Sequence, residues 1–399
     1  MSQVNRLLHG GRIDRDSSLT FTFNGTTYQG HKGDTLASAL MANGIKVVGR
    51  SFKYHRPRGI LGAGAEEPNA ILQIGSTPAT QSPNMRATQT ELFDGLDSRV
   101  VNAWPSLEND ALSVVGKIGG SMMPAGFYYK TFMYPESLWP QYEKHIRNAA
   151  GLGEAPMALD ANTYDKMQHH CDVLIVGAGA AGLMAARQLS GLGLRMIVVD
   201  EQSEMGGGLL HTRTQIDTAP ATEWVAETLS LLEQDRDCML LPKSTAFGYY
   251  DHNFVGVLER RTDHLGEDAK GSRQRIHHIR AKQVLLATGA IERPLVFGNN
   301  DLPGCMLASA VSTYLNRYAV TPGESLVLMT TNDDAYDAAI DWQAAGLHVE
   351  AIVDSRSHVE GDKIDQAKAL GITVLLGHAV TNVQGSDHVT GAEVAPIDK

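Results

Sequence analysis

A glycine-rich turn between two apolar strands is the feature that most restricts the fold of this chain. Residues 173–176 (VLIV) form a continuous apolar run, which is typical of a strand buried on both faces of a parallel sheet. Residues 177–182 (GAGAAG) match the pattern GxGxxG and open an apolar helix, and residues 195–200 (RMIVVD) give a second strand. This order predicts a βαβ unit with a dinucleotide at its glycine turn.

Each glycine of the turn has a separate physical role in this interpretation. Gly177 permits the tight turn, Gly179 lets a pyrophosphate approach the backbone, and Gly182 lets the helix lie close to the strand. The helix N-terminus supplies free N–H groups and a positive dipole for the phosphates. Asp200 ends the second strand, where its carboxylate can accept both ribose hydroxyls of an adenosine. Its charge disfavours a 2′-phosphate, so these residues predict NAD or FAD rather than NADP.

Two further segments extend this pattern. Residues 206–208 (GGG) follow the acidic residue closely, and residues 287–289 (ATG) end a later apolar strand. Both resemble segments that lie beside the nucleotide in the two-dinucleotide-binding flavoproteins, and the resemblance implies contacts from Gly207, Gly208, Thr288 and Gly289. Residues 169–399 are therefore expected to form a FAD/NAD(P)-binding domain of the Rossmann type, incomplete at its C-terminus.

A second βαβ unit is predicted from residue 325, but its turn is unlike the first. Residues 330–335 (TTNDDA) contain none of the three glycines, and they place two adjacent carboxylates where a pyrophosphate would lie. We therefore expect a degenerate unit that keeps the fold without the ligand, and one dinucleotide for the chain. The same pattern disfavours an autonomous reductase, because such an enzyme would need two nucleotide sites.

Residues 1–100 are predicted to form a small β-grasp domain. Asn24-Gly25 between two apolar–polar alternating runs is a strong hairpin signal, and a short helix is expected over 36–42. A helix followed by a Gly-rich loop resembles the plant-type ferredoxin fold, in which cysteine thiolates hold a [2Fe–2S] cluster. Residues 1–170 contain no cysteine, so we expect a ferredoxin-like domain without the cluster and with a structural or interface role.

Two other segments have less regular patterns. Residues 101–168 are rich in aromatic residues, proline and methionine, and they are interpreted as a connecting segment with one helix over 139–149. The stretch 46–58 holds five Lys or Arg residues, one His and no acidic residue. It can contact a phosphate or carboxylate of a flavin nucleotide or a partner chain. The alternative is a solvated loop with a few ion pairs.

Composition and charge exclude several classes of protein. The chain has 399 residues with 45 acidic and 34 basic side chains, a formal net charge of −11, which argues against binding to nucleic acid or a membrane surface. The sequence has no apolar run near the ~20 residues of a membrane span and no secretory signal. Cys171, Cys238 and Cys305 form no CxxC pair, so a reducing cytoplasm is expected.

No catalytic or metal-binding constellation is predicted. His277 and His278 are adjacent in an expected strand and point to opposite faces, which makes them a poor metal pair. His169-His170 are interpreted as the polar edge of a linker. Cys305 lacks a nearby cysteine partner for a dithiol relay and is interpreted as a packing residue.

Several longer motifs give a more specific resemblance. Residues 51–59 (SFKYHRPRG) and 62–69 (GAGAEEPN) resemble the N-terminal signature of the alpha subunits of heterotetrameric sarcosine oxidase. Residues 289–294 (GAIERP) and 301–308 (DLPGCMLA) resemble the same family, and the order of parts agrees over essentially the whole chain.

The resemblance implies an oxidase complex in which this chain is inactive alone. The family oxidises the N-methyl group of sarcosine to give glycine and hydrogen peroxide, and with tetrahydrofolate it gives 5,10-methylenetetrahydrofolate. The alpha subunit binds NAD, the beta subunit holds FAD and covalent FMN with the oxidation site, and gamma and delta subunits complete the heterotetramer. The implied NAD contacts are Ala181, Asp200, Glu201, Gln202, Gly208 and Ala246.

One departure from the family leaves alternatives open. Alpha subunits of the family are longer and carry a C-terminal folate-binding domain, which these residues do not include, so a fragment or a shorter relative is expected. A subunit of a related opine, proline or N-methylglutamate dehydrogenase, or a non-catalytic NAD-binding assembly protein, remains an alternative.

Overall fold

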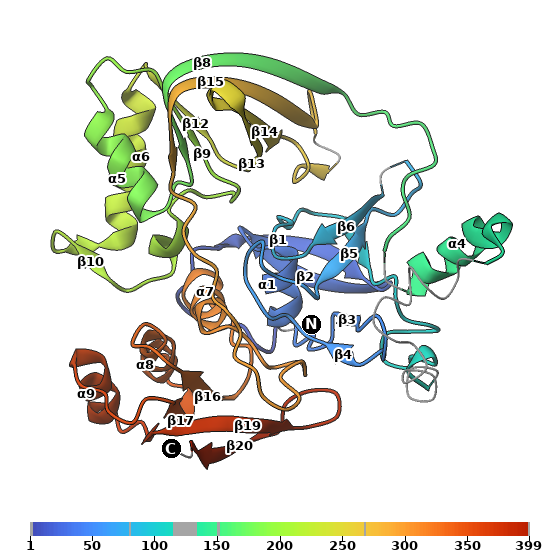
Figure 1. Ribbon diagram of the computed structural model, residues 1–399, viewed down its shortest axis with the longest axis vertical. Helices are drawn as coiled ribbons and strands as arrows, with labels where there is room; N and C mark the ends of the chain where they lie inside the picture. The colour runs from blue at the N-terminus through green and yellow to red at the C-terminus, as the bar shows by residue number, and fades with distance from the viewer. Residues whose placement is uncertain (1–2, 80, 115–133, 150–151, 267–268, 398–399) are drawn as a thin grey trace. The chain divides into compact units, whose positions relative to one another are not determined.

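The chain folds into two compact units. The computed structural model describes residues 3–79, 81–114, 134–149, 152–266 and 269–397 (Figure 1). Residues Met1–Asp160 and Glu292–Lys399 form the first unit, and Ala161–Ile291 form the second. The predicted division into domains at 1–100, 101–168 and 169–399 stays a prediction, and residues 115–133 of the connecting segment lie outside the described residues.

The unit Ala161–Ile291 contains the strand–turn–helix pattern predicted for a nucleotide. Its elements are β8 (Tyr164–Val176), α5 (Ala180–Leu189), β9 (Met196–Val199), η3 (Gly207–Leu210), β10 (Gln215–Ile216), β11 (Ala219–Pro220), α6 (Ala221–Gln234), β12 (Cys238–Leu241), β13 (Ser244–Tyr250), η4 (Asp251–Asn253), β14 (Phe254–Arg260) and β15 (Gln274–Leu286). The six-stranded sheet has the order β12-β9-β8-β15-β14-β13. Strands β12, β9, β8 and β15 are parallel, whereas β15, β14 and β13 are joined antiparallel.

Helices α5 and α6 cover one side of the parallel strands (Figure 1). Leu183 of α5 and Trp224 of α6 are buried against Val198 of β9 in one apolar cluster. The predicted βαβ unit is therefore confirmed.

The strand before the glycine turn is longer than predicted. β8 begins at Tyr164 and pairs in parallel with β15 over the full length of both strands. His169 and His170 lie inside β8, so their interpretation as the edge of a linker is wrong. The polar half of β8 is held by distant groups, such as Arg275, which donates to the Asp165 carboxylate at 2.8 and 2.9 Å.

The N-terminal part of the other unit is a five-stranded sheet around one buried helix. Its elements are β1 (Asp14–Phe23), β2 (Thr26–Lys32), α1 (Leu36–Ala42), β3 (Gly49–Arg50), β4 (Pro57–Arg58), β5 (Ile71–Ile74), β6 (Ser82–Arg86), β7 (Leu96–Arg99), η2 (Glu136–Leu138) and α4 (Trp139–Ala149). The sheet order is β2-β1-β7-β5-β6, and all seven residues of α1 are buried. Asn24 and Gly25 turn the β1–β2 hairpin with φ of 51° and 79°, as the sequence predicts.

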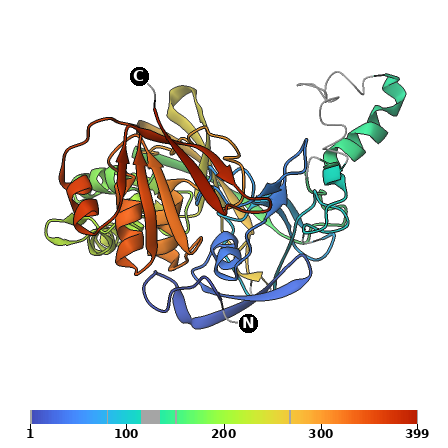
Figure 2. The ribbon, with the colours of Figure 1, turned by 90° about the horizontal axis from the view of Figure 1, so that it is seen from below.

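The C-terminal part of the same unit contains the second βαβ arrangement, seen from below in Figure 2. Its elements are α7 (Ala308–Tyr318), β16 (Ser325–Thr330), α8 (Tyr336–Ala344), β17 (His348–Asp354), α9 (Asp362–Ala369), β18 (Val374–Leu376), β19 (His378–Gln384) and β20 (Gly391–Pro396). Strands β16, β17 and β18 are parallel, and β19 and β20 form a hairpin. Within the described ranges, no helix combines the length and apolar character needed to cross a membrane.

Candidate functional site

The glycine turn after β8 is held too tightly for side chains at two of its positions. Gly177 has a φ of +101°, and a Cβ atom there would lie 2.3 Å from the carbonyl oxygen of Ala287. A Cβ atom on Gly182 would lie 1.8 Å from the carbonyl oxygen of Gly177. The backbone therefore requires glycine at both positions, as the roles assigned from the sequence predict.

Gly179 differs from these two glycines because it faces open space. A Cβ atom at Gly179 would meet no atom within 4 Å, and its φ of −77° is ordinary. Gly179 is the N-cap of α5, where no side chain caps the helix and the first turn holds no acidic residue. The first amides of α5, including that of Ala181, are therefore available to an anion, which the helix dipole also favours.

Asp200 connects the glycine turn to the loop after β9. Its carboxylate accepts hydrogen bonds from the backbone N–H of Ala178 at 2.7 Å and of Gln202 at 2.9 Å. The side chain is nearly buried. These bonds hold the Asp200 carboxylate beside the glycine turn, where the sequence predicts contacts with ribose hydroxyls. The loop is further fixed by Arg260, which donates to the carbonyl of Glu201 at 2.8 Å.

The second glycine cluster lies directly against the first. The Gly206 N–H donates to the Ala178 carbonyl at 2.9 Å, and a Cβ atom on Gly207 would lie 3.0 Å from the Cα of Gly179. Gly208 has open space around its Cα. The Ala287 N–H donates to the Val176 carbonyl at 2.7 Å, which brings the segment with Thr288 and Gly289 beside the same turn.

Ala246 reaches this region through the start of β13. The Ser244 N–H donates to the Asp200 carbonyl at 2.7 Å, and Ala246 packs against the apolar cluster that contains Leu174 and Val199. The structure thus assembles the predicted residues around one turn: Gly177, Gly179, Ala181, Gly182, Asp200, Glu201, Gln202, Gly207, Gly208, Ala246, Thr288 and Gly289. Their contact with a nucleotide stays a prediction.

The corresponding turn of the second βαβ unit is filled by its own side chains. Asp354 ends β17 as Asp200 follows β9, and it is fully buried. Tyr336 donates from its hydroxyl to the Asp354 carboxylate at 2.9 Å, and Arg356 donates to it at 2.7 and 3.0 Å. Arg356 also donates to Asp333 at 2.8 Å, within the turn itself.

The contacts in this turn shift the pKa values of Asp354 and Tyr336. Burial raises the pKa of Asp354, but the hydrogen bonds from Arg356 and Tyr336 outweigh burial, so its pKa lies below the ordinary value. Burial and the bond to Asp354 raise the pKa of the Tyr336 hydroxyl. The sequence analysis did not predict that Tyr336 and Arg356 bond Asp354. The visible signals were a tyrosine at the start of α8 and an arginine two residues after Asp354.

Several basic side chains of the stretch 46–58 form ion pairs or hydrogen bonds within the protein. Arg56 donates to both oxygens of Asp301 at 2.8 and 2.9 Å, and Arg58 also bonds that carboxylate. Arg50 donates to the Leu107 carbonyl, and buried His55 contacts buried Asp110 at 2.8 Å. Burial raises the pKa of Asp301, but Arg56 and Arg58 lower it below its ordinary value. These contacts favour the ion-pair interpretation of this stretch.

The structure shows the surroundings of the histidines and cysteines that the sequence singles out. His277 bridges His169 at 2.8 Å and Glu259 at 2.9 Å, a chain of pairwise contacts. Over the described ranges, the structure brings together no group of three ligands that could hold a metal ion. The three cysteines are free thiols, and burial raises the pKa of each to about 11: Cys171, Cys238 and Cys305.

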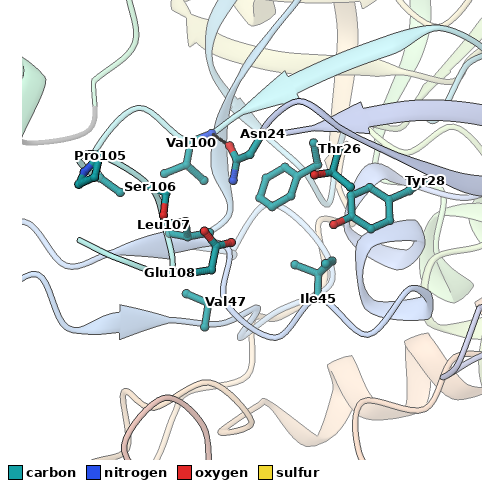
Figure 3. Close-up of a pocket in the computed structure, with 12 residues that line it drawn as sticks. Asn24, Thr26, Tyr28, Ile45, Val47, Val100, Pro105, Ser106, Leu107 and Glu108 are labelled. Atoms are coloured by element: carbon teal, nitrogen blue, oxygen red, sulfur yellow. Dashed lines mark hydrogen bonds between the residues drawn. The ribbon is translucent and has the colours of Figure 1, made fainter. Parts of the chain in front are cut away.

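A pocket of about 250 Å³ opens in the N-terminal sheet, apart from any predicted site residue (Figure 3). Tyr28 of β2 and Ile45 lie on one side, and the loop with Ser106 and Glu108 lies opposite. Hydroxyl, carboxylate and apolar groups therefore share its lining. No sequence motif predicted this pocket.

The turn and the parallel sheet have the architecture that is typical of nucleotide-binding oxidoreductase domains. The chain belongs to the pyridine nucleotide-disulphide oxidoreductase family, which matches residues 171–398. The family described as a 2Fe-2S iron-sulfur cluster binding domain matches residues 16–102. The predicted α/β class, with a ferredoxin-like domain before a nucleotide-binding domain, is confirmed by these matches.

Curated proteins that match almost the whole chain show a more specific relationship. The chain is 48% identical over 377 residues to sarcosine oxidase subunit alpha of Rhizobium meliloti (strain 1021), covering 93% of this chain and 38% of that protein. It is 37% identical over 397 residues to sarcosine oxidase subunit alpha of Corynebacterium sp. (strain U-96), covering 98% and 36%. The predicted resemblance to these subunits is confirmed, and the chain spans about two fifths of the length of these curated relatives.

A solved structure supports the fold alone. The L-proline dehydrogenase from P.horikoshii aligns with a TM-score of 0.58 and 18% sequence identity. The alignment covers 98% of this chain and 59% of that chain.

Proposed function

We propose that this chain is the NAD-binding portion of an alpha subunit of sarcosine oxidase. The observation that carries the proposal is the glycine turn, where Gly179 faces open space beside the uncapped N-terminus of α5. The pyrophosphate would lie over this helix end, and Asp200 would accept hydrogen bonds from the adenosine ribose. The identity of 48% to the Rhizobium meliloti subunit supports the choice of family member.

The acidic residue supports NAD over its phosphorylated form. A 2′-phosphate beside the Asp200 carboxylate would bring like charges together in a nearly buried place. NAD, when bound, supplies a carrier for hydride. This chain's own contribution is to bind and orient the nucleotide, since we propose no catalytic residue in it.

The chemistry of the proposed complex resides on other subunits. The proposed reaction oxidises sarcosine to glycine with hydrogen peroxide, and with tetrahydrofolate it yields 5,10-methylenetetrahydrofolate. We assign FAD and FMN to the beta subunit or to its contact with this chain, and gamma and delta subunits to the same heterotetramer. The three cysteines are free thiols, which suits a reducing compartment, so we place the complex in the cytoplasm.

The site can be tested with a matched pair of glycine variants. Gly179→Ala adds a methyl group in open space, so the fold should persist while the approach of the pyrophosphate is blocked. We expect calorimetric NAD affinity to fall about tenfold or more, with an unchanged unfolding midpoint. Gly323→Ala is the control, because its added Cβ would have only the Ser325 carbonyl oxygen within 4 Å, at 3.8 Å. A chain that binds neither NAD nor FAD at millimolar concentration would refute the proposal.

The substrate is tested separately from the nucleotide. Nucleotide released from the purified chain is identified by mass spectrometry, and NAD is expected rather than FAD. The chain is then mixed with a candidate beta subunit, and sarcosine-dependent peroxide should appear only in the mixture. Oxidation of an opine, proline or N-methylglutamate instead would favour the related dehydrogenases. Inactivity with every partner would favour an assembly protein.

A further inference from the structure

The loop between β4 and β5 is organised around a buried carboxylate. Glu67 is only 1% exposed. One of its oxygens accepts the backbone N–H groups of Leu61 and Gly62, both at 2.7 Å. The other accepts those of Asn69 at 2.6 Å and Ala70 at 3.0 Å. One side chain therefore satisfies four amides that come from both ends of the loop.

The neighbouring carboxylate satisfies the middle of the same loop. Glu66 accepts the N–H groups of Ala63 at 2.7 Å and Gly64 at 2.9 Å. Cβ atoms at Gly62 and Gly64 would lie 2.5 and 2.7 Å from oxygens of Glu66, so a side chain at either position would have to displace this carboxylate. Backbone amides that converge in this way form an anion-binding nest, the arrangement that proteins also use around iron–sulfur clusters.

The cluster implied by the matched domain does not fit these residues. The iron–sulfur family match spans residues 16–102, which include this loop and the preceding helix α1. A [2Fe–2S] cluster of that kind needs cysteine thiolates, and the first cysteine of the chain is Cys171. Six amides of the loop, those of residues 61–64, 69 and 70, are already paired with carboxylate oxygens.

We propose that residues 59–70 are a cluster-type loop whose anion is supplied from within by Glu66 and Glu67. The two carboxylates take over the electrostatic role of an anionic cluster and hold the loop in a fixed shape. The inference concerns the ferredoxin-like domain and does not depend on the proposed NAD site.

Residues 59–70 also pack against the C-terminal part of the same unit. The Leu61 carbonyl accepts the Leu307 N–H at 3.0 Å, and the Gly62 carbonyl accepts the Tyr314 hydroxyl of α7 at 3.0 Å. A Cβ atom on Gly59 would lie 2.7 Å from the Cα of Pro303. Burial, followed by the charges of Glu67 and Glu66, raises the pKa of Tyr314 well above its ordinary value. The loop thus joins two parts of the chain instead of carrying electrons.

Chemical rescue can test whether the loop is an anion nest. Glu67→Ala removes the carboxylate and leaves four amides for an added small anion. We expect its unfolding midpoint to fall by about 5 °C or more, because buried donors lose their partners. Sodium formate should restore much of this loss, whereas sodium chloride at equal ionic strength should not. The control is Glu360→Ala, whose side chain is 83% exposed and lies 3.1 Å from the ring of exposed His358.

Two milder variants keep the test decisive if Glu67→Ala does not fold. Glu67→Gln retains one acceptor oxygen, and Glu66→Ala leaves only two amides unpaired. Both variants should therefore lose less stability than Glu67→Ala. Formate should raise the unfolding midpoint of Glu66→Ala. Unchanged midpoints, or equal formate effects on these variants and on Glu360→Ala, would overturn the proposal. Incubation of the native chain with iron, sulfide and thiol should produce no visible cluster absorption, and a stable band would overturn it as well.

Discussion

The hydroxyl of Tyr336 donates a 2.9 Å hydrogen bond to the fully buried carboxylate of Asp354. This bond joins the first residue of α8 to the last residue of β17, across the turn where a βαβ unit would otherwise receive a phosphate. Arg356 completes the arrangement by bonding Asp354 and Asp333. The second unit therefore replaces ligand contacts with internal ones.

Removing the Tyr336 hydroxyl should destabilise the chain without creating a nucleotide site. In Tyr336→Phe, the buried Asp354 carboxylate loses one donor while Arg356 stays in place. We expect a loss of about 1–3 kcal/mol in the free energy of unfolding, measured with urea. Tyr134→Phe is the control, because Tyr134 is 89% exposed, and it should change little. A second equivalent of bound NAD in the Tyr336 variant would contradict this reading of the turn.

The stability of the chain should fall on mild acidification, in part through His169. Burial lowers the pKa of His169, and the neighbouring His277 and Arg275 lower it further. Since the folded pKa lies below the unfolded value of about 6.5, the unfolded chain binds the proton more readily, and stability decreases as the pH falls through that value.

Urea unfolding at about pH 7.5 and about pH 5.5 checks this dependence. His169→Gln should show a weaker loss between the two values than the native chain does. His358→Gln is the matched control, since His358 lies in an exposed pair with Glu360. An identical pH dependence for His169→Gln and the native chain would remove His169 from the explanation.

The three thiols should react slowly in the folded protein. Burial raises the pKa of each to about 11, so the thiolate fraction at about pH 8 is on the order of one thousandth. A colorimetric disulfide reagent should therefore label the native chain slowly and the urea-unfolded chain quickly. Rapid labelling of one native thiol would indicate a reactive cysteine that the structure does not place.

Glu292 should stabilise the start of α7. Its carboxylate accepts the N–H groups of Ala308 at 3.0 Å and Ser309 at 2.8 Å, whereas the N-cap residue, Leu307, has no side-chain acceptor. Glu292→Ala should cost about 0.5–2 kcal/mol in unfolding free energy, as the loss of a helix cap does. Glu292→Gln keeps one acceptor oxygen and should lose less. Equal stability of all three chains would show that the cap contributes nothing.

The sequence was sufficient to predict those parts of the fold that depend on local patterns. The glycine turn at Gly177 and the hairpin at Asn24-Gly25 require backbone conformations that few residues adopt, so their residues identify them. The absence of cysteine before Cys171 likewise excluded a cluster directly from composition.

The features that were missed depend on distant partners. The polar residues of β8 gave no strand signal. Their pairing with β15, and the hydrogen bond that Arg275 donates to Asp165, connect positions more than a hundred residues apart. The role of Glu67 was equally hidden, since a glutamate in a Gly-rich loop is ordinarily solvated. Only the fold places four amides around it.

The side chains that fill the turn of the second βαβ unit depend on one another. Neither Tyr336 nor Arg356 can be lost singly without leaving the charge of Asp354 buried with fewer partners. Restoring space for a ligand at this turn would therefore take several substitutions made together, because each single loss first lowers the stability of the chain.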